Sequence, residues 1–450
     1  MIDFTSGNPM KQMLIFSVPL LLGNLLQNLF SIADMAIVGR FIGGTALAAI
    51  GSTVVVIQFL IAILIGLATG ASIVISQFFG AKKEEELKKT VATSLIAMAG
   101  LSIILTVLGV LGAGPMLRLL GVEDIIFYDA KVYFRILMAG VTFPIYLNVY
   151  MAYMRALGDS KSPLIILSIS AVLNVILNIV FIMVFGWGIA GVGLATIVSQ
   201  TLALGACIAI AERKIPQLRL RLSDIRFDKA IFKLILTYGI PASIQLSITS
   251  LATLTIMRLV NLLGAVAVAG FSVGTRVENF AMMPLANINI AISTFVGQNI
   301  GAGNEERAKE GLRSGIKLVL IIGGVASAIL LIFSPDLMRL FVAPDDIHAA
   351  GIIREGALYL SIISMFSVLF GIFFAFNGFF RGVGDQVIVM ALTITSLSIR
   401  ATLAHVLVLG FDWGLEAIAW SIPVGWALCG TFAYIYYRSG RWRGKAAVGK

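Results

Sequence analysis

Charged residues are scarce in this chain. Only 12% of its 450 residues are Asp, Glu, Lys or Arg, whereas 59% are hydrophobic, and the mean hydropathy is +0.99. This balance excludes the soluble globular classes, whose surfaces need more charge. The sequence therefore predicts an all-α integral membrane protein, with the lipid bilayer around most of its surface.

Cysteine and histidine are nearly absent. Cys207 and Cys429 lie inside apolar segments, so neither a disulfide framework nor a zinc site is predicted. His348 and His405 are too far apart in sequence to indicate a His-based metal site. No Walker-type phosphate loop occurs, which gives no support to ATP-driven work by this chain. We predict no cofactor.

The net charge of +10 lies mainly in the loops and tails. Without a basic and aromatic module outside the spans, nucleic acid is not an expected partner. One set of alternate connections is rich in Lys and Arg and the other is poor, which places both termini in the cytoplasm. We expect the protein to be a multi-pass protein of a prokaryotic plasma (inner) membrane. The first apolar span is too long for a signal peptide, and we expect it to be kept.

Apolar runs between charged or Gly/Pro breaks predict twelve transmembrane helices. They are placed at 11–38, 46–78, 90–113, 127–153, 162–185, 189–211, 231–259, 265–297, 312–334, 350–378, 386–409 and 415–437. A basic polar connection, 212–230, is expected to be a cytoplasmic linker. It separates an N-lobe, 1–211, from a C-lobe, 231–450, with six helices each.

The two halves resemble each other at several landmarks in the same order. Pro19 matches Pro241 at an offset of 222, Gln77 matches Gln298 at 221, and MRALGD matches FRGVGD at 226. A nearly constant offset indicates duplication. Because each copy has an even number of spans, the lobes should be related by a pseudo-twofold axis along the membrane normal, with a cavity between them.

The first span carries a polar stripe that ends in a carboxylate. Its members fall within about 120° of a helical wheel, and they are Asn24, Gln27, Asn28, Ser31 and Asp34. Lipid cannot satisfy these groups, so the stripe should face protein or water. The amides alone are typical of a polar interface that joins this helix to its neighbours, whereas Asp34 favours a functional ion site.

Two other spans place polar groups near the depth of Asp34. Ser170, Asn174 and Asn178 form a stripe at intervals of four residues on the fifth span, and Thr196 lies on the sixth. At 1.5 Å per residue, Asp34 lies about 9 Å, and Asn178 and Thr196 about 12 Å, from the outer ends of their helices. We expect these groups to meet.

Three sets of sequence motifs resemble those of the multidrug and toxic compound extrusion (MATE) family. They are FSIADMAIVGRFIGGTALAAIGS in the first half, the paired SQFFGAKKEEELKK and GQNIGAGNEERAKE, and RALGDSKSP with FRGVGD. The resemblance covers essentially the whole chain. It implies two six-helix lobes and alternating access, with export of amphipathic or cationic small molecules, drugs or toxins, in exchange for H⁺ or Na⁺. It implies a transporter and not an enzyme, and we expect a monomer.

The resemblance also assigns residues to the coupling ion. Asp34 is the expected proton carrier, with Asn174, Asn178 and Thr196 as hydrogen-bonding partners. Na⁺ could instead bind the oxygens of Asp34, Asn178 and Thr196, and we favour H⁺. Some relatives carry a second acid at Asn178, so this chain gives no support to a two-acid relay. Pro19 interrupts the first span and is either a moving hinge or a fixed kink.

The second half is predicted not to repeat this site, since Ile256 stands at the position equivalent to Asp34. Side chains expected to line the cavity are Gln27, Asn28, Gln245, Arg276, Glu278, Met282, Met283, Asn377 and Arg400. For the charged ones an ion-pair network, including Glu278 with Arg400, is the competing interpretation. For the methionines, ordinary packing competes with drug contact.

Two other functions compete with antiport. One is the flipping of a lipid-linked intermediate, which would favour several basic residues in the central cavity. The other is a membrane-embedded enzyme, for which RALGDSKSP and FRGVGD are the nearest candidates. Their recurrence at equivalent loops favours structural turns.

Overall fold

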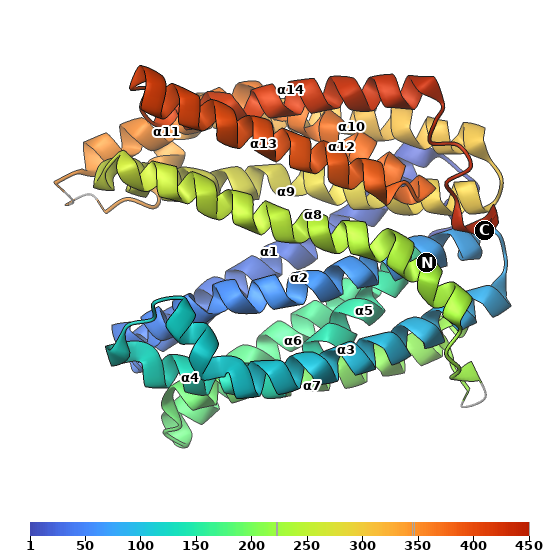
Figure 1. Ribbon diagram of the computed structural model, residues 1–450, viewed down its shortest axis with the longest axis horizontal. Helices are drawn as coiled ribbons and strands as arrows, with labels where there is room; N and C mark the ends of the chain where they lie inside the picture. Colours follow the sequence, from blue (N-terminus) through green and yellow to red (C-terminus); the bar gives the residue numbers. More distant parts are fainter. Residues whose placement is uncertain (222–223, 344, 346, 450) are drawn as a thin grey trace. The chain divides into compact units, whose positions relative to one another are not determined.

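The computed structural model describes residues 1–221, 224–343, 345 and 347–449, and all regular structure in them is helical (Figure 1). The first half contains α1 (Pro9–Phe41), α2 (Gly44–Gly80), α3 (Glu84–Leu119), α4 (Asp124–Ala139), α5 (Thr142–Ala156), α6 (Lys161–Ile179), the π-helix η1 (Val180–Val184) and α7 (Gly188–Lys214). The second half contains α8 (Lys229–Leu262), α9 (Ala265–Gly301), α10 (Glu305–Arg339), α11 (Ala349–Met365), α12 (Ser367–Val383), α13 (Gln386–Phe411) and α14 (Leu415–Ser439).

These helices confirm the predicted all-α membrane fold. Ten are long and apolar enough to cross a membrane alone, and the count reaches twelve if the pairs α4–α5 and α11–α12 each form one span. The pairs bend by 51° and 54°, at the fourth span of each half. A bend does not interrupt the apolar run, so hydropathy predicted each pair as one continuous helix.

The fourth span breaks at Gly140, which packs closely against α7. A Cβ placed on Gly140 would lie 2.5 Å from Ile197 Cγ2, too close for any larger residue in this arrangement. Glycine at the break therefore lets the bent fourth span pack closely against α7.

The chain forms two compact units, and each is described by itself. Unit 1 comprises Met1–Asp3 and Val18–Ser243, and unit 2 comprises Phe4–Ser17 and Ile244–Lys450. The chain therefore passes from one unit to the other inside α1, beside Pro19, and inside α8, beside Pro241. Both prolines lie within their helices and lack the amide hydrogen of a regular helical turn. The duplication thus extends to the places where each long helix changes unit.

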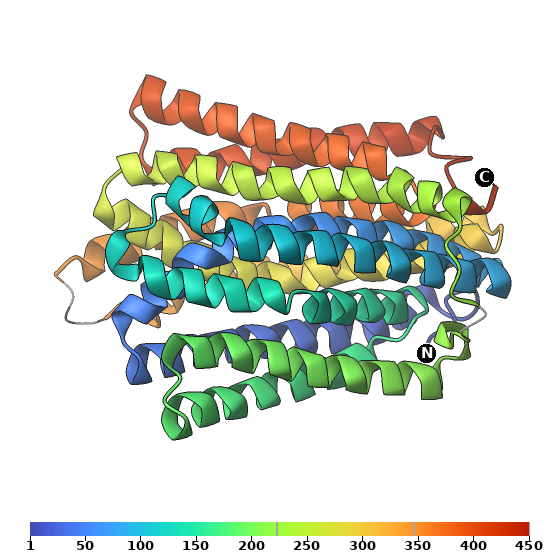
Figure 2. The same ribbon diagram turned by 60° about the horizontal axis from the view of Figure 1, so that its bottom comes forward.

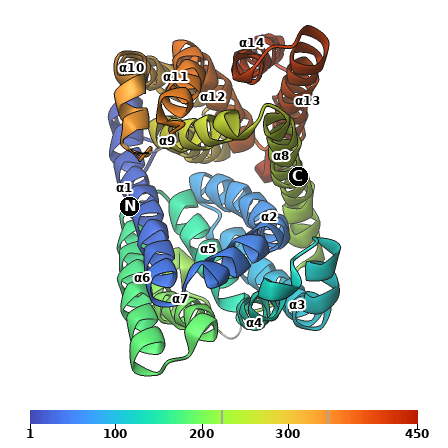
Figure 3. The same cartoon turned by 90° about the vertical axis from the view of Figure 1, so that its left-hand side faces the viewer.

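In unit 1, helices α2 to α7 form a bundle. α2 packs against α3, α4 and α5, and α7 packs against α4, α5 and α6. The helices run alongside one another (Figure 2), and Figure 3 views the bundle nearly along their axes. The first part of α8 packs onto α2. Gly66 and Gly70 of α2 are four residues apart, and these small residues let the two helices approach closely.

In unit 2, α9 is the most buried of the long helices, and it contacts α10, α11 and α12. The segment Phe4–Ser17 packs onto this unit. The Phe4 ring is fully buried against Phe16 and Phe295, and its carbonyl oxygen accepts hydrogen bonds from Asn299 Nδ2 and Arg307 Nε, both at 3.0 Å. Burial of an aromatic ring with its backbone satisfied holds this segment in unit 2.

Gly70→Ala should lower the thermal unfolding temperature of the purified protein in detergent. The added Cβ would lie 2.6 Å from Gly239 N and from Ile235 O, so α8 must move away from α2. Overpacking of this kind costs about 1–3 kcal/mol. Gly51→Ala on the same helix is the control, because a Cβ there meets nothing within 4 Å. Equal unfolding temperatures for the two variants would contradict this packing.

Candidate functional site

A hydrogen-bonded chain of polar side chains joins α1, α6 and α7 within unit 1. Asn178 Nδ2 donates to the carboxylate of Asp34 and also to Asn174 Oδ1, the latter at 3.2 Å. Asn174 Nδ2 donates to Thr196 Oγ1 at 3.4 Å, and the Thr196 hydroxyl donates to the carbonyl of Val192 at 3.1 Å. The structure thus brings together Asp34, Asn174, Asn178 and Thr196.

Asn178 is the most deeply placed member of this chain. Its side chain has 0% exposure, whereas Asp34, Asn174 and Thr196 are partly buried. Its Oδ1 is buried and accepts no hydrogen bond from any residue that the structure describes. A buried acceptor without a donor costs free energy, so this oxygen is poised to accept a hydrogen bond from a new donor.

The helix geometry changes directly after Asn178. The α-helix α6 ends at Ile179 and continues as the π-helix Val180–Val184. Short π segments inside helices are rare and frequently occur at functional sites.

Tyr133 of α4 is a neighbour of this site that the sequence analysis missed. Its side chain is 6% exposed, and its ring lies beside Gly193 of α7, three residues before Thr196. Tyr133 is an isolated tyrosine among apolar neighbours, so it forms no polar stripe of the kind that marks Asp34 and Asn178. Its depth could have revealed it, because Tyr133 lies nine residues after the start of α4, about 13 Å along the helix.

Gln27 and Asn28 of the first-span stripe have no hydrogen bond to the Asp34 chain among the described residues. Gln27 and Asn28 are exposed, and Asn28 Nδ2 donates to the carbonyl of Asn24 on its own helix at 3.0 Å. Pro19, at the other end of the helix, is buried.

In unit 2, Tyr359 is the hydrogen-bond partner of Glu278. The tyrosine hydroxyl donates to Glu278 Oε2 at 2.7 Å. Arg400 acts electrostatically on both groups without a direct ion pair to Glu278, and its Nε is buried with no acceptor among the described residues. Arg276 is exposed. The structure thus places Glu278 and Arg400 in one cluster and Arg276 outside it.

The uncharged residues predicted for the second half occupy separate positions. Gln245 Nε2 donates to Thr393 at 2.9 Å, and Gln245 Oε1 accepts from Gln386 at 3.0 Å. Asn377 is buried and donates to the carbonyl of Phe373 at 2.9 Å. Met282 is buried, and Met283 is partly buried.

The donor set at Asp34 suits a monovalent cation. One carboxylate with amide and hydroxyl oxygens can bind H⁺ or Na⁺. The described residues contain no group of three or more His, Cys, Asp or Glu side chains that could hold a metal ion. The site therefore has the chemistry of a single titrating acid with neutral partners.

Comparison with known proteins identifies the family. A family model described as MatE matches residues 19–180 and again 241–406, so the two matches begin at the equivalent prolines. The chain belongs to the MATE family. The members of this family are membrane transporters and not enzymes, and the chain is accordingly a transporter with multiple membrane spans.

Bacterial relatives and solved structures agree with this assignment. The probable multidrug resistance protein YpnP of Bacillus subtilis is 31% identical over 445 residues, which cover 98% of this chain and 97% of the relative. The probable multidrug resistance protein YoeA of the same organism is 35% identical over 346 residues, covering 75% and 74%. An outward-facing multidrug resistance MATE transporter aligns with a TM-score of 0.89 and 25% identity over 97% of each chain.

Asn178→Leu should reduce gradient-driven efflux of ethidium from proteoliposomes by at least about tenfold. The change removes the donor to Asp34 while keeping a similar volume, and a hydrogen bond to a charged group contributes about 1.5–3 kcal/mol. Ser168→Ala on the same helix is the control, because that hydroxyl donates only to the carbonyl of Leu164. Efflux by Asn178→Leu at the rate of the control would exclude a role for this amide.

Proposed function

We propose that this transporter is a secondary antiporter that exports amphipathic or cationic small molecules in exchange for H⁺. Asp34 is the proton carrier in this proposal, and Asn174, Asn178 and Thr196 support it. The observation that carries the proposal is the hydrogen bond between Asn178 and Asp34, which ties the acid of α1 to α6.

Both protonation states of Asp34 can find partners at this site. The charged carboxylate accepts from Asn178 Nδ2, and a protonated carboxyl group can donate to an oxygen such as the unpartnered Asn178 Oδ1. Each state favours a different orientation of the amide. A proton can therefore shift the balance between two local arrangements of α1 and α6 by its different affinity for them.

The hydrogen-bond directions favour H⁺ over Na⁺. An amide N–H directed at Asp34 places partial positive charge where Na⁺ would bind. Thr196 Oγ1 already accepts from Asn174. Sodium would have to displace both donors, whereas a proton needs only the carboxylate. Na⁺ bound by Asp34, Asn178 and Thr196 is the alternative.

The positions at which α1 and α8 change unit support alternating access. Val18 and Ile244 each begin a new unit, one residue before Pro19 and three residues after Pro241. We place hinges at these prolines, because a helix that lacks one hydrogen bond there bends at lower cost. Asp34 lies on the same helix as Pro19, so a change at the acid can be transmitted along α1.

The basic connections support cytoplasmic termini, as the sequence predicts. In this proposal the protein works as a monomer, with six-helix lobes at 1–211 and 231–450 and a cytoplasmic linker at 212–230. Gln27, Asn28, Gln245, Arg276, Glu278, Met282, Met283, Asn377 and Arg400 are its proposed cavity residues.

Asp34→Asn should abolish ethidium export from proteoliposomes driven by an imposed H⁺ gradient, because an amide cannot bind and release the proton. Efflux is measured with H⁺ and Na⁺ gradients imposed separately. The control is Asp336→Asn, which removes an exposed carboxylate paired only with Arg339 on its own helix. Export by Asp34→Asn at the wild-type rate under both gradients would refute the assignment.

A further inference from the structure

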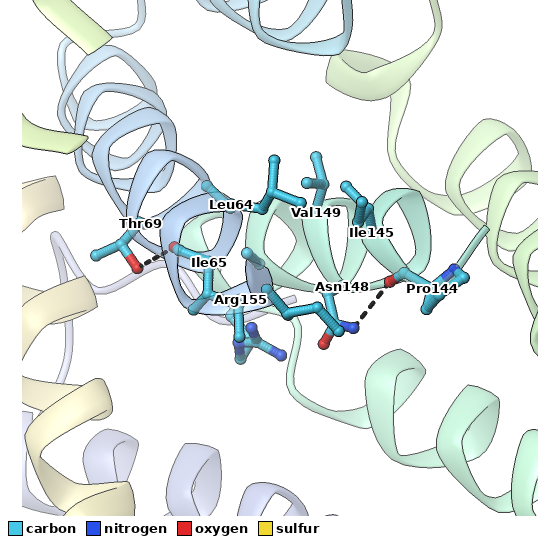
Figure 4. Close-up of a pocket in the computed structure, with 11 residues that line it drawn as sticks. Leu64, Ile65, Thr69, Pro144, Ile145, Asn148, Val149 and Arg155 are labelled. Carbon is cyan, nitrogen blue, oxygen red and sulfur yellow. Dashed lines mark hydrogen bonds between the residues drawn. The ribbon is translucent and has the colours of Figure 1, made fainter. Parts of the chain in front are cut away.

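A groove in unit 2 is bounded by α10 and α14, with α12 as its floor. α12 contacts both of these helices, which Figure 3 shows around it. The groove has a volume of ≈ 510 Å³, within the usual range of small-molecule sites of about 300–1,000 Å³. The pocket between α2 and α5 in unit 1, shown in Figure 4, has only ≈ 90 Å³. Of these two, the groove in unit 2 has room for a ligand of ordinary size.

The deeper part of this groove is apolar. Its floor is formed by Leu369, Ile372 and Phe376 of α12, and Ile316 of α10 lies beside them. These side chains offer a ligand no charge and no hydrogen bond. This part of the groove therefore suits a hydrocarbon chain.

Gly430 of α14 keeps the apolar part of the groove open. A Cβ placed on Gly430 would meet no atom within 4 Å, so no contact between helices requires a glycine there. Gly371 of α12 differs, because a Cβ at that position would collide with Val319 of α10. Glycine inside a helix costs about 1 kcal/mol relative to alanine. The missing side chain at Gly430 thus leaves space that a ligand can fill.

Two arginines lie at one end of the groove. Arg313 is near the start of α10, and Arg438 is in the last turn of α14. Both residues are exposed, and neither guanidinium group forms a hydrogen bond or an ion pair with any residue that the structure describes. Their donors are therefore available to a ligand.

The acids at the start of α10 are engaged elsewhere. Glu305 pairs with Arg443 at 3.2 Å, and Glu306 pairs with Lys309 at 2.6 Å. An anion that neutralises the two arginines of the groove must therefore come from outside the described chain.

Two tyrosines lie between the arginines and the apolar floor. Tyr434 and Tyr437 line the groove, and the ring of Phe376 contacts both, with centroid distances of 6.3 and 5.8 Å. Aromatic rings with a polar tip are typical of the membrane–water interface. The order along the groove is thus charge, interfacial aromatic residues and then apolar side chains, which is the order of groups in a phospholipid.

The length of the groove also matches one leaflet. Its lining on α14 extends from Trp426 to Arg438, which is about 18 Å along the helix. Half of the hydrocarbon core of a bilayer is about 15 Å thick. A lipid whose headgroup lies at Arg438 therefore has its acyl chains at the depth of the apolar floor.

Membrane topology explains only part of this arrangement. It favours Lys and Arg at the cytoplasmic end of every span. At the offsets of 221 and 226 that relate the two halves, however, Arg313 corresponds to Ala92 and Arg438 to Glu212. Unit 1 therefore has no such pair at the equivalent positions, and the pair is particular to the groove in unit 2.

We propose that this groove binds an anionic phospholipid, with its phosphate at Arg313 and Arg438 and one acyl chain along α12. Guanidinium groups match phosphate oxygens with paired N–H donors. Basic pockets between transmembrane helices at the cytoplasmic face suit anionic headgroups. This inference uses the cytoplasmic orientation proposed above, and it depends neither on the coupling ion nor on the exported substrate.

The test measures lipid binding to the full-length protein in neutral detergent by native mass spectrometry. Dioleoylphosphatidylglycerol and dioleoylphosphatidylcholine have the same acyl chains, and only the first carries a net negative charge. The wild type should bind phosphatidylglycerol at least about tenfold more tightly than phosphatidylcholine. Arg313→Gln/Arg438→Gln should bind the two lipids equally.

Two further variants separate this site from general effects of charge and folding. Arg213→Gln/Arg226→Gln removes the same charge at exposed positions of unit 1 and should keep the wild-type preference. Gly430→Phe keeps both arginines of the groove and fills its apolar part, so it should bind phosphatidylglycerol at least about fivefold more weakly. The open space at Gly430 should let this variant fold, which its thermal unfolding temperature without lipid checks.

Each of the following results would overturn the proposal. They are equal binding of the two lipids by the wild type, a preference that persists in Arg313→Gln/Arg438→Gln, loss of the preference in the unit 1 control, and wild-type affinity for phosphatidylglycerol in Gly430→Phe. Displacement of the lipid by an equal concentration of glycerol 3-phosphate, which has no acyl chain, would assign the site to small anions. Binding is measured without an ion gradient, so this proposal and the antiport proposal can fail independently.

Discussion

The proposed mechanism depends most on one hydrogen bond, from the amide of Asn178 to the carboxylate of Asp34. A carboxylate inside an apolar helical bundle is stable only if donors replace the water it has lost. Asn178 supplies one such donor, and its own Oδ1 remains without a donor among the described residues. This pairing gives the site a preferred charged arrangement and room for a neutral one, which a switch requires.

In the proposed mechanism, the duplicated architecture gives this switch a means of acting at a distance. α1 contributes its first turns to unit 2 and the remainder, including Asp34, to unit 1. α8 contributes its first turns to unit 1 and the remainder, after Pro241, to unit 2. A local rearrangement at Asp34 is therefore connected through one helix to the other unit. The halves are nevertheless unequal chemically, since Glu278 with Tyr359 in unit 2 lies on helices not equivalent to those of the Asp34 chain.

Much of this could be predicted from sequence, because lipid imposes strong constraints on pattern and depth. Twelve apolar runs predicted the membrane spans, and equal depth predicted that Asn178 and Thr196 lie in one site with Asp34. Other features could not be predicted from sequence, for physical reasons. The bends at Gly140 and Phe366 leave hydropathy unchanged, and the isolated Tyr133 breaks no pattern.

The central claim is that the Asp34 carboxyl group is neutral in one state of the transporter and charged in another. Infrared difference spectroscopy tests this directly by recording the carbonyl stretch of a protonated carboxylic acid as ethidium binds to the purified protein. The account predicts that a carboxylic acid band disappears on binding in the wild type and is missing throughout in Asp34→Asn. The same band change in Asp34→Asn, or no band change in the wild type, would contradict it.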